Sequence, residues 1–181
     1  MTQVVVRRAS VGDARAIATI RVETWRAAYA GLIAAEVLDR FDIDREAQRR
    51  ATHWEERHVD PQSVELIAEV GGEPVGWAAA GPSRDGETDG WGEVYAIYTL
   101  PAHWSTGVGH ALMTAAEDFL RRAGFRRAHL WYLDGNERAA SFYQRHGWVD
   151  DGATKLDDRL VADARAAALL ERRRVRDLVD S

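Results

Sequence analysis

Short apolar runs and stretches of helical periodicity follow one another along the chain. An apolar run begins at residues 4–6, and hydrophobic residues then recur on one helical face after Ser10 and Asp13, which form a capping-box-like pair. A second helical region is expected over residues 34–56, with a break near 41–44. The first part of the chain therefore predicts one strand and two helical regions.

Two apolar runs in the middle of the chain, residues 64–70 and 74–80, are joined by Gly71 and Gly72. Consecutive glycines supply the positive φ angles that a tight hairpin needs, so the two runs should pair as antiparallel strands. The next stretch, residues 81–90, is polar and rich in turn residues, which predicts an exposed loop.

The second half of the chain alternates strand and helix patterns. Strands are expected at residues 91–100 and 126–133, helices closed by glycine at residues 107–122 and 137–146, and an extended segment from Trp148. The C-terminal stretch has alanine-rich helix propensity, but a closing strand near 168–176 also fits its position and is the interpretation we favour.

The order of these segments is β-α-α-β-β-β-α-β-α-β-β. It predicts an α/β (α+β) fold with a twisted, mixed and mostly antiparallel sheet of about six or seven strands, flanked by about four helices. The sheet should switch to a parallel β-α-β crossover in its second half. No repeat or linker interrupts the sequence, so residues 1–181 should form a single domain.

Composition narrows the class of protein. Hydrophobic residues make up 46% and charged residues 29% of the chain, and no export or anchoring signal is visible, so we expect a soluble, cytoplasmic protein with no membrane partner. Cysteine is absent, which excludes disulfides, thiolate metal sites and a cysteine nucleophile. The net charge of -5 argues against nucleic acid as a partner, and a homodimer stays open.

The segment EVYAIYTLPAHWSTGVGHALM, residues 93–113, is the most informative about chemistry. A strand runs into a loop that contains Gly107 and Gly109, and the loop opens into a helix. Glycines let the backbone approach a diphosphate, and the helix N-terminus adds partial positive charge, so an anion should bind there. The alternative is a tight turn with no ligand. A dinucleotide-binding loop fits less well, because Leu112 replaces the third glycine of that motif.

Two stretches resemble the GCN5-related N-acetyltransferase (GNAT) superfamily. Residues 104–109, WSTGVG, are similar to its acetyl-CoA signature R/Q-x-x-G-x-G/A, with Trp104 at the arginine or glutamine position. Residues 131–148, WYLDGNERAASFYQRHGW, are similar to its N-x-x-A-x-x-F-Y-x-x-x-G-F segment, with Trp148 in place of the final phenylalanine. The resemblance extends over most of the chain.

The resemblance implies the GNAT fold, with acetyl-CoA as co-substrate. Two splayed strands would end near Thr99 and Leu133, and the pantetheine arm would lie between them, paired with the backbone of residues 97–99. The diphosphate would lie on the N–H groups of residues 105–110. The implied cofactor-binding residues are Ile97, Tyr98, Thr99, Trp104, Ser105, Thr106, Gly107, Val108, Gly109, His110, Asn136 and Tyr143.

The resemblance also implies roles in proton transfer. Tyr143 matches the tyrosine that protonates the departing CoA thiolate in many members of the superfamily, and Glu93 matches a glutamate that deprotonates the incoming ammonium. The implied reaction moves an acetyl group to a primary amine of a small molecule or peptide, by direct attack in a ternary complex. The structural alternatives are a buried tyrosine beside Phe142, an exposed strand carboxylate at Glu93, and an N-cap role for Asn136.

Aromatic and acidic residues suggest where the acceptor binds. The candidate acceptor-binding residues are Trp25, Tyr29, Trp77, Glu93 and Trp131, although core packing is the default role of such rings. The first helix and the 81–90 loop should close this end of the cleft and contribute Glu23, Asp85, Glu87 and Asp89. This mixture suits a cationic, partly apolar amine.

Rival functions stay open at this point. A non-catalytic acyl-CoA-binding sensor or interaction module would keep the glycine loop but would not need Tyr143, Glu93 and Asn136 together. A hydrolase is a weaker choice, because Ser83 lacks the second glycine of a nucleophile elbow. No metal is expected, since His53 and His58 are five positions apart and a two-histidine helical site needs four.

Overall fold

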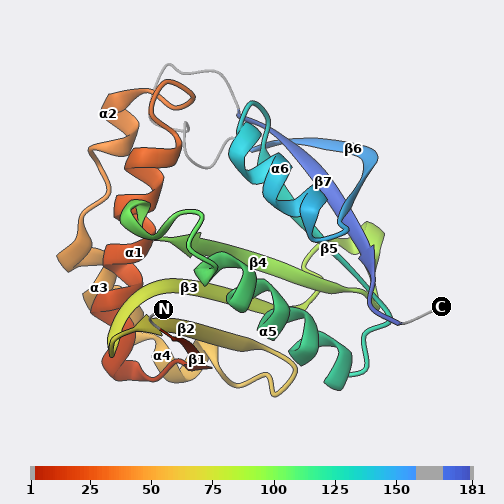
Figure 1. The fold of residues 1–181 in the computed structure, drawn as a ribbon, viewed down its shortest axis with the longest axis horizontal. Coiled ribbons are helices and arrows are strands. Elements are labelled where there is room, and N and C mark those ends of the chain that lie inside the picture. The colour runs from red at the N-terminus through yellow and green to blue at the C-terminus, as the bar shows by residue number, and fades with distance from the viewer. Residues whose placement is uncertain (1–2, 158–168, 180–181) are drawn as a thin grey trace.

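Seven strands form one sheet in the computed structural model, which describes residues 3–157 and 169–179 (Figure 1). The strands are β1 Val4–Arg8, β2 Val64–Val70, β3 Glu73–Pro82, β4 Gly92–Thr99, β5 Arg127–Leu133, β6 Val149–Asp157 and β7 Leu169–Asp177. They lie in the order β1-β2-β3-β4-β5-β7-β6, and each neighbouring pair is antiparallel except β4 with β5. The predicted mixed sheet and its parallel crossover are therefore confirmed.

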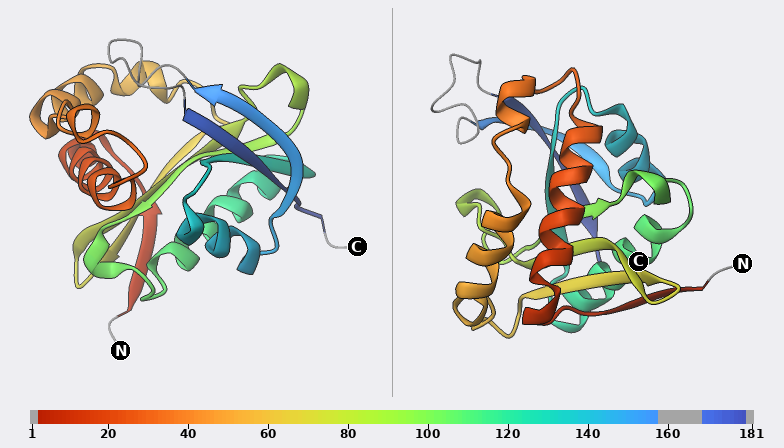
Figure 2. Two further views of the ribbon diagram at one scale, coloured as in Figure 1. Left: turned by 90° about the horizontal axis from the view of Figure 1, so that it is seen from above. Right: turned by 90° about the vertical axis from the view of Figure 1, so that its left-hand side faces the viewer.

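Helices cover both faces of this sheet. The described α-helices are α1 Ala14–Ala28, α2 Ala35–Leu38, α3 Ile43–Thr52, α4 Trp54–Arg57, α5 Val108–Arg122 and α6 Glu137–Arg145, and short 3-10 turns lie at Val11–Asp13, Gly86–Thr88 and Pro101–His103. The helices α1 and α3 lie over one face, and α5 and α6 lie over the other (Figure 2).

The prediction of about four helices is too low, because residues 34–56 form three helices. The predicted break near 41–44 is present, and Asp42 caps α3 by accepting a hydrogen bond from the Arg45 N–H at 2.7 Å. His53 then separates α3 from α4 with a non-helical backbone.

Two apolar clusters hold the helical layers on the sheet. The larger one lies under α5 and includes Leu112, Met113 and Trp148, each with an exposed fraction of 0%. The other lies under α1 and includes Ile17 and Ile67, which are also fully buried. Burying one such side chain contributes about 1.5–3 kcal/mol, so both layers are firmly attached to the sheet.

The local turn signals are largely confirmed. Gly71 and Gly72 have φ angles of 64° and 86° and join β2 to β3, and Ser10 and Asp13 form the predicted capping box. The expected loop at 81–90 is shorter than predicted, because β3 continues to Pro82 and a 3-10 turn occupies part of the remainder.

The C-terminal segment forms β7, as favoured from the sequence. This strand pairs with β5 on one side and with β6 on the other, so it is an interior strand of the sheet. Position 168, where the closing strand was expected to begin, lies outside the described residues.

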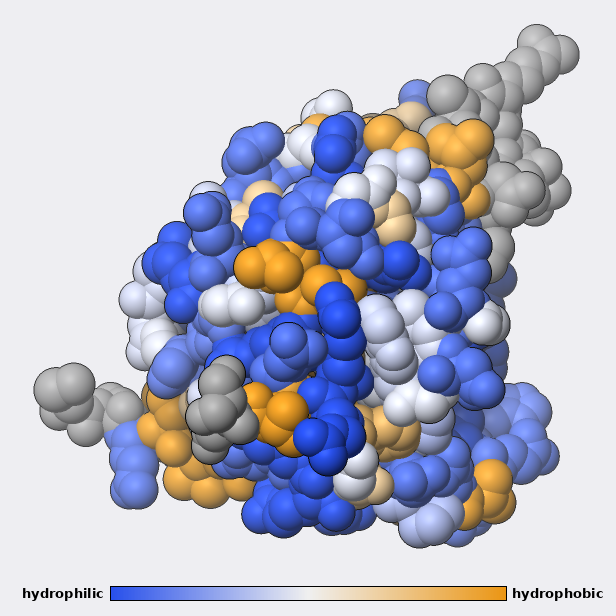
Figure 3. Space-filling model, turned by 90° about the vertical axis from the view of Figure 1, so that its right-hand side faces the viewer, coloured by the Kyte–Doolittle hydropathy of each residue, from blue (hydrophilic) through white to orange (hydrophobic). Residues whose placement is uncertain are grey.

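The surface in Figure 3 is mostly hydrophilic, and its apolar residues form small separate patches. Scattered apolar side chains are normal on a protein surface. None of the described helices is long and apolar enough to cross a membrane. The homodimer stays a prediction.

Candidate active site

The site begins where β4 and β5 separate. Their parallel ladder pairs Gly92 with Ala128 and Glu93 with His129, and from there the strands diverge towards their C-terminal ends. The predicted splayed pair is thus confirmed. Ordinary ladder partners are missing along the facing edges of the two strands beyond this point, which leaves room and backbone groups for a ligand.

Two hollows meet at this gap. One of about 760 Å³ opens beside α5 and α6, and we call it the α5/α6 hollow. The other, of about 710 Å³, opens beside α1 and α3, and we call it the α1/α3 hollow. Both are lined by the same strip of residues, Tyr29, Val94, Tyr95, Ala96, Tyr98, Trp131 and Tyr132. A molecule in one hollow can therefore contact a molecule in the other across the gap.

The loop before α5 is shaped to hold an anion. Gly107 is the N-cap of α5 with φ 93°, and Ser105 has φ 62°, the one positive φ at a non-glycine position within the described ranges. Left-handed residues in such a loop turn N–H groups towards a common concave side. The first N–H groups of α5 also lack partners within the helix, and the macrodipole favours negative charge there.

The α5/α6 hollow collects most of the predicted cofactor-binding residues. Ten line it, namely Ile97, Tyr98, Thr99, Trp104, Ser105, Gly107, Gly109, His110, Asn136 and Tyr143. The other two do not. Thr106 is exposed and its hydroxyl donates to the His103 carbonyl at 2.7 Å, while the Val108 side chain is fully buried in the core. These two can contribute through their backbone.

The end of β4 is partly occupied by internal hydrogen bonds. The Thr99 carbonyl accepts from Trp104 Nε1 at 2.8 Å and from Thr24 Oγ1 at 3.0 Å. Both lone pairs of this oxygen are thus used, and it cannot also pair with a cofactor arm. The Trp104 indole thus fixes the loop to β4, and a contact of its side chain with a cofactor stays a prediction.

The sequence did not reveal three basic side chains, two in α6 and one at its C-cap. Arg138, Arg145 and His146 line the α5/α6 hollow. Arg138 lies over the Trp104 ring at 4.1 Å, and His146 Nε2 lies 3.3 Å from His110 Nδ1. Burial, together with the neighbouring His110, lowers the pKa of His146. Their spacing along the predicted 137–146 helix, with 138 and 145 seven apart, was the available signal that they share a face.

Asn136 is the N-cap of this helix, and Tyr143 lies in its last turn. The Asn136 side chain accepts from the Ala139 N–H at 3.2 Å, so the N-cap alternative is confirmed, and the contact of its amide group with a cofactor stays a prediction. Tyr143 is 8% exposed, and its hydroxyl has no hydrogen-bond partner in the described part of the chain. Burial raises the pKa of Tyr143 above its ordinary value of 10.0, so this phenol keeps its proton at neutral pH.

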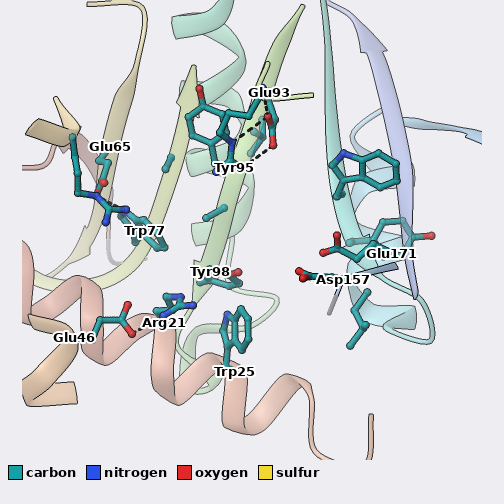
Figure 4. A pocket seen from close by; sticks show the side chains of 18 of the residues that line it. Arg21, Trp25, Glu46, Glu65, Trp77, Glu93, Tyr95, Tyr98, Asp157 and Glu171 are labelled. Atoms are coloured by element: carbon teal, nitrogen blue, oxygen red, sulfur yellow. Dashed lines mark hydrogen bonds and ion pairs between the residues drawn. The ribbon is translucent and has the colours of Figure 1, made fainter. Parts of the chain in front are cut away.

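The α1/α3 hollow brings together all five predicted acceptor residues: Trp25, Tyr29, Trp77, Glu93 and Trp131. Figure 4 labels three of them, Trp25, Trp77 and Glu93. Trp25 meets Tyr29 edge-on at 5.1 Å, and Lys155 lies over the Trp131 ring at 4.3 Å. Trp77 is 4% exposed and donates to Glu65 at 3.0 Å, so it also belongs to the core.

The acidic residues that line this hollow differ from the four that the sequence predicted. Glu23, Asp85, Glu87 and Asp89 do not line it. Asp85 and Glu87 instead lie 3.8 Å and 3.9 Å from Arg173 on β7. The acids that do line it are Glu46, Glu65, Glu93, Asp157 and Glu171.

Glu93 is buried and held by one neighbour. Its exposed fraction is 4%, so the alternative of an exposed carboxylate is wrong. It accepts from the Arg84 backbone N–H at 2.8 Å and from Arg84 Nη2 at 2.7 Å (Figure 4). Its oxygen Oε2 also lies 3.9 Å from His129 Nε2. These contacts place Glu93 at the point where β4 and β5 part.

His129 makes folding stability depend on pH. It is 0% exposed, and Nε2 lies 2.8 Å from Ser83 Oγ and 3.0 Å from Thr88 Oγ1. Burial lowers its pKa below the ordinary 6.5, so the unfolded chain binds a proton at a higher pH than the folded chain does. The stabilisation is fully present above about pH 6.5 and is lost as the pH falls through the folded pKa.

We therefore expect the free energy of unfolding, measured with urea, to fall as the pH drops from about 7 to 5, and to fall less steeply in His129→Gln. Asp13 does not titrate between pH 7 and 5, because its hydrogen bonds with Arg7 lower its pKa to about 2. Its effect on folding stability is therefore expected at lower pH. Equal slopes in the two proteins between pH 7 and 5 would show that another group titrates.

No group of three or more histidine, aspartate or glutamate side chains in residues 3–157 and 169–179 is arranged to hold a metal ion.

Comparisons with known proteins agree with this geometry. The model of the acetyltransferase (GNAT) family matches residues 22–148. The uncharacterized N-acetyltransferase YuaI of Bacillus subtilis is 31% identical over 144 residues, 79% of each chain. The mycothiol acetyltransferase of Acidimicrobium ferrooxidans is 32% identical over 111 residues, 61% of this chain and 34% of that enzyme. The structure of YncA from Salmonella typhimurium with acetyl-CoA superposes with a TM-score of 0.67 at 20% identity, covering 98% and 95% of the two chains.

Proposed function

Because the chain belongs to the acetyltransferase (GNAT) family, a family of acetyl-CoA-dependent N-acetyltransferases, we propose that it acetylates a primary amine of a small molecule or peptide by direct attack in a ternary complex. The observation that carries the proposal is the gap between β4 and β5, where the two hollows share one lining strip. Donor and acceptor can meet there without either crossing the sheet.

The α5/α6 hollow has the features that a nucleotide diphosphate needs. The left-handed residues Ser105 and Gly107 and the first turn of α5 offer backbone N–H groups. A Cβ on Gly109 would lie 3.2 Å from the Phe142 ring, so the space beside this backbone is already tight. Arg138 and Arg145 add positive charge nearby.

Two residues would move protons in this reaction. The bound donor supplies the acetyl group as a thioester. Tyr143 gives its hydroxyl proton to the sulfur as the carbon–sulfur bond breaks. Glu93 takes a proton from the incoming ammonium, directly or through one water, which leaves the neutral amine that attacks the thioester carbonyl. With no cysteine in the chain, direct transfer is the simplest route.

Two measurements test the proposal. Calorimetry with acetyl-CoA and desulfo-CoA tests the cofactor site, and thiol release with a panel of amines and peptides tests catalysis. We expect binding in the micromolar range and turnover with at least one amine. Absence of binding at millimolar ligand would overturn the assignment of the α5/α6 hollow. Tight binding without turnover for any amine would favour the non-catalytic sensor instead.

Replacing Glu93 by glutamine should lower kcat about 10- to 100-fold at neutral pH, because the amide cannot take up the proton. The fold should tolerate the change, since Arg84, the ion-pair partner, has a side chain that is 61% exposed. The measurement is kcat as a function of pH. If kcat were unchanged in Glu93→Gln but lower in Glu171→Gln, Glu171 and not Glu93 would be the base that deprotonates the amine.

A further inference from the structure

One wall of the α1/α3 hollow carries more positive than negative charge. This wall is formed by α1, α3, α4 and β2, and its charged residues are Arg21, Arg49, Arg50 and Arg57 with Glu46 and Glu65. Four guanidinium groups thus face two carboxylates. The wall has a formal excess of two positive charges.

The two carboxylates compensate two of the arginines. Arg21 Nη1 donates to Glu46 at 2.6 Å, and Arg50 Nη1 donates to both oxygens of Glu65 at 2.9 Å and 3.0 Å. Arg49 and Arg57 are exposed, and neither forms an ion pair with any part of the chain that the structure describes. The excess charge therefore belongs to these two side chains at the outer part of the wall.

Arg50 provides a second, independent sign of a ligand. It is 4% exposed, lies over the Trp77 ring at 4.7 Å, and lines the hollow. Its Nε is buried without a hydrogen-bond partner among the described residues. Buried donors in native proteins are nearly always paired, so this N–H calls for an acceptor oxygen from outside the chain.

The opposite wall carries the carboxylates of Glu93, Asp157 and Glu171 and the cations Arg84 and Lys155, and Lys155 Nζ lies 3.3 Å from Glu171. Asp157 and Glu171 extend into the hollow from β6 and β7, across from Arg21 and Glu46 (Figure 4). The three carboxylates thus exceed the two cations by one negative charge, and Glu93 lies at the gap itself, where an ammonium group would arrive.

We propose that the acceptor carries an anionic oxygen group, a carboxylate or a phosphate, in addition to its amine, and that Arg49, Arg50 and Arg57 bind this group. The inference rests on the proposed function and specifies its substrate class. Arginine suits the role because its planar donors match carboxylate and phosphate oxygens. Binding the anion on this wall would orient the amine towards the gap.

The test uses matched acceptors that differ in the anionic group. Free amino acids are compared with their carboxamides, and O-phosphoethanolamine with ethanolamine, which separates carboxylate from phosphate. We expect kcat/KM to favour the anionic member of a pair by at least about tenfold. The carboxamide has the less basic amine, so intrinsic reactivity would favour the carboxamide over the free acid.

Variants then locate the site. Arg49→Gln and Arg57→Gln should each raise KM for the anionic acceptor about tenfold and leave KM for its neutral partner unchanged. Arg45→Gln is the matched control, because Arg45 is exposed on the same helix and does not line the hollow. Arg50 is left intact, since its loss would leave the Glu65 carboxylate without its arginine partner.

Calorimetry with the unreacted anionic acceptor separates this inference from the proposed function. Binding that is lost in the Arg49→Gln, Arg57→Gln double variant supports the anionic site even if no amine is acetylated. Efficient acetylation of neutral amines, with no preference for the anionic partner, would leave the acetyltransferase proposal standing and overturn this one. Failure of every anionic acceptor to bind or react would overturn it as well.

Discussion

Replacing Gly109 by aspartate should abolish acetyl-CoA binding, with a loss of affinity of at least about 100-fold, because a carboxylate facing a diphosphate at close range costs several kcal/mol. Gly109 lies in the first turn of α5 and lines the α5/α6 hollow. A side chain there would enter the space between the backbone and the Phe142 ring, where a Cβ alone comes within 3.2 Å. Calorimetry with acetyl-CoA measures the loss.

A matched variant separates charge from volume. Gly109→Asn adds nearly the same atoms without the charge, so it should bind more tightly than Gly109→Asp. The aspartate should not destabilise α5 through its charge, since a negative side chain in the first turn interacts favourably with the partial positive charge of the helix N-terminus. Thermal unfolding of both variants tests this. Binding by Gly109→Asp within tenfold of the native protein would mean that the diphosphate lies elsewhere.

The cofactor side of the molecule was predictable because its signals are local. Gly71 and Gly72 specify the hairpin through their own φ angles, and Gly107 begins α5 through a positive φ that a glycine adopts at little cost. The separation of β4 and β5 followed from the family resemblance and not from these local rules. What the local rules missed on this side, the basic residues of α6, required knowing which helical face turns towards the gap.

The acceptor side was predictable only in part, because it is assembled from distant segments. The aromatic residues were identified, but the acids Glu46, Glu65 and Glu171 come from α3, β2 and β7, which are far apart in the sequence. Nothing in the local pattern says that these elements meet. The wrong choice of Asp85 and Glu87 has the same origin, since their proximity to Arg173 on β7 is a long-range contact.

The Tyr143→Phe variant should lower kcat by about 100-fold and leave acetyl-CoA affinity nearly unchanged. The ring keeps its contacts with Tyr132 and Phe142, whose centroids lie 5.7 Å and 5.5 Å away, so the walls of the hollow are preserved. What is lost is the proton donor. Because burial raises the pKa of Tyr143 above its ordinary value of 10.0, this donor should keep its proton at pH values where an ordinary phenol loses it.

Tyr95→Phe is the matched control for this prediction, because its hydroxyl is already engaged with the Pro82 carbonyl at 2.5 Å. Removing that hydroxyl should cost about 1 kcal/mol of folding free energy and change kcat little. Tyr143→Phe should show the reverse, because its hydroxyl forms no hydrogen bond with the described residues: unchanged stability and much lower kcat. Full activity in Tyr143→Phe would remove Tyr143 as the acid and require a water or another group to protonate the thiolate.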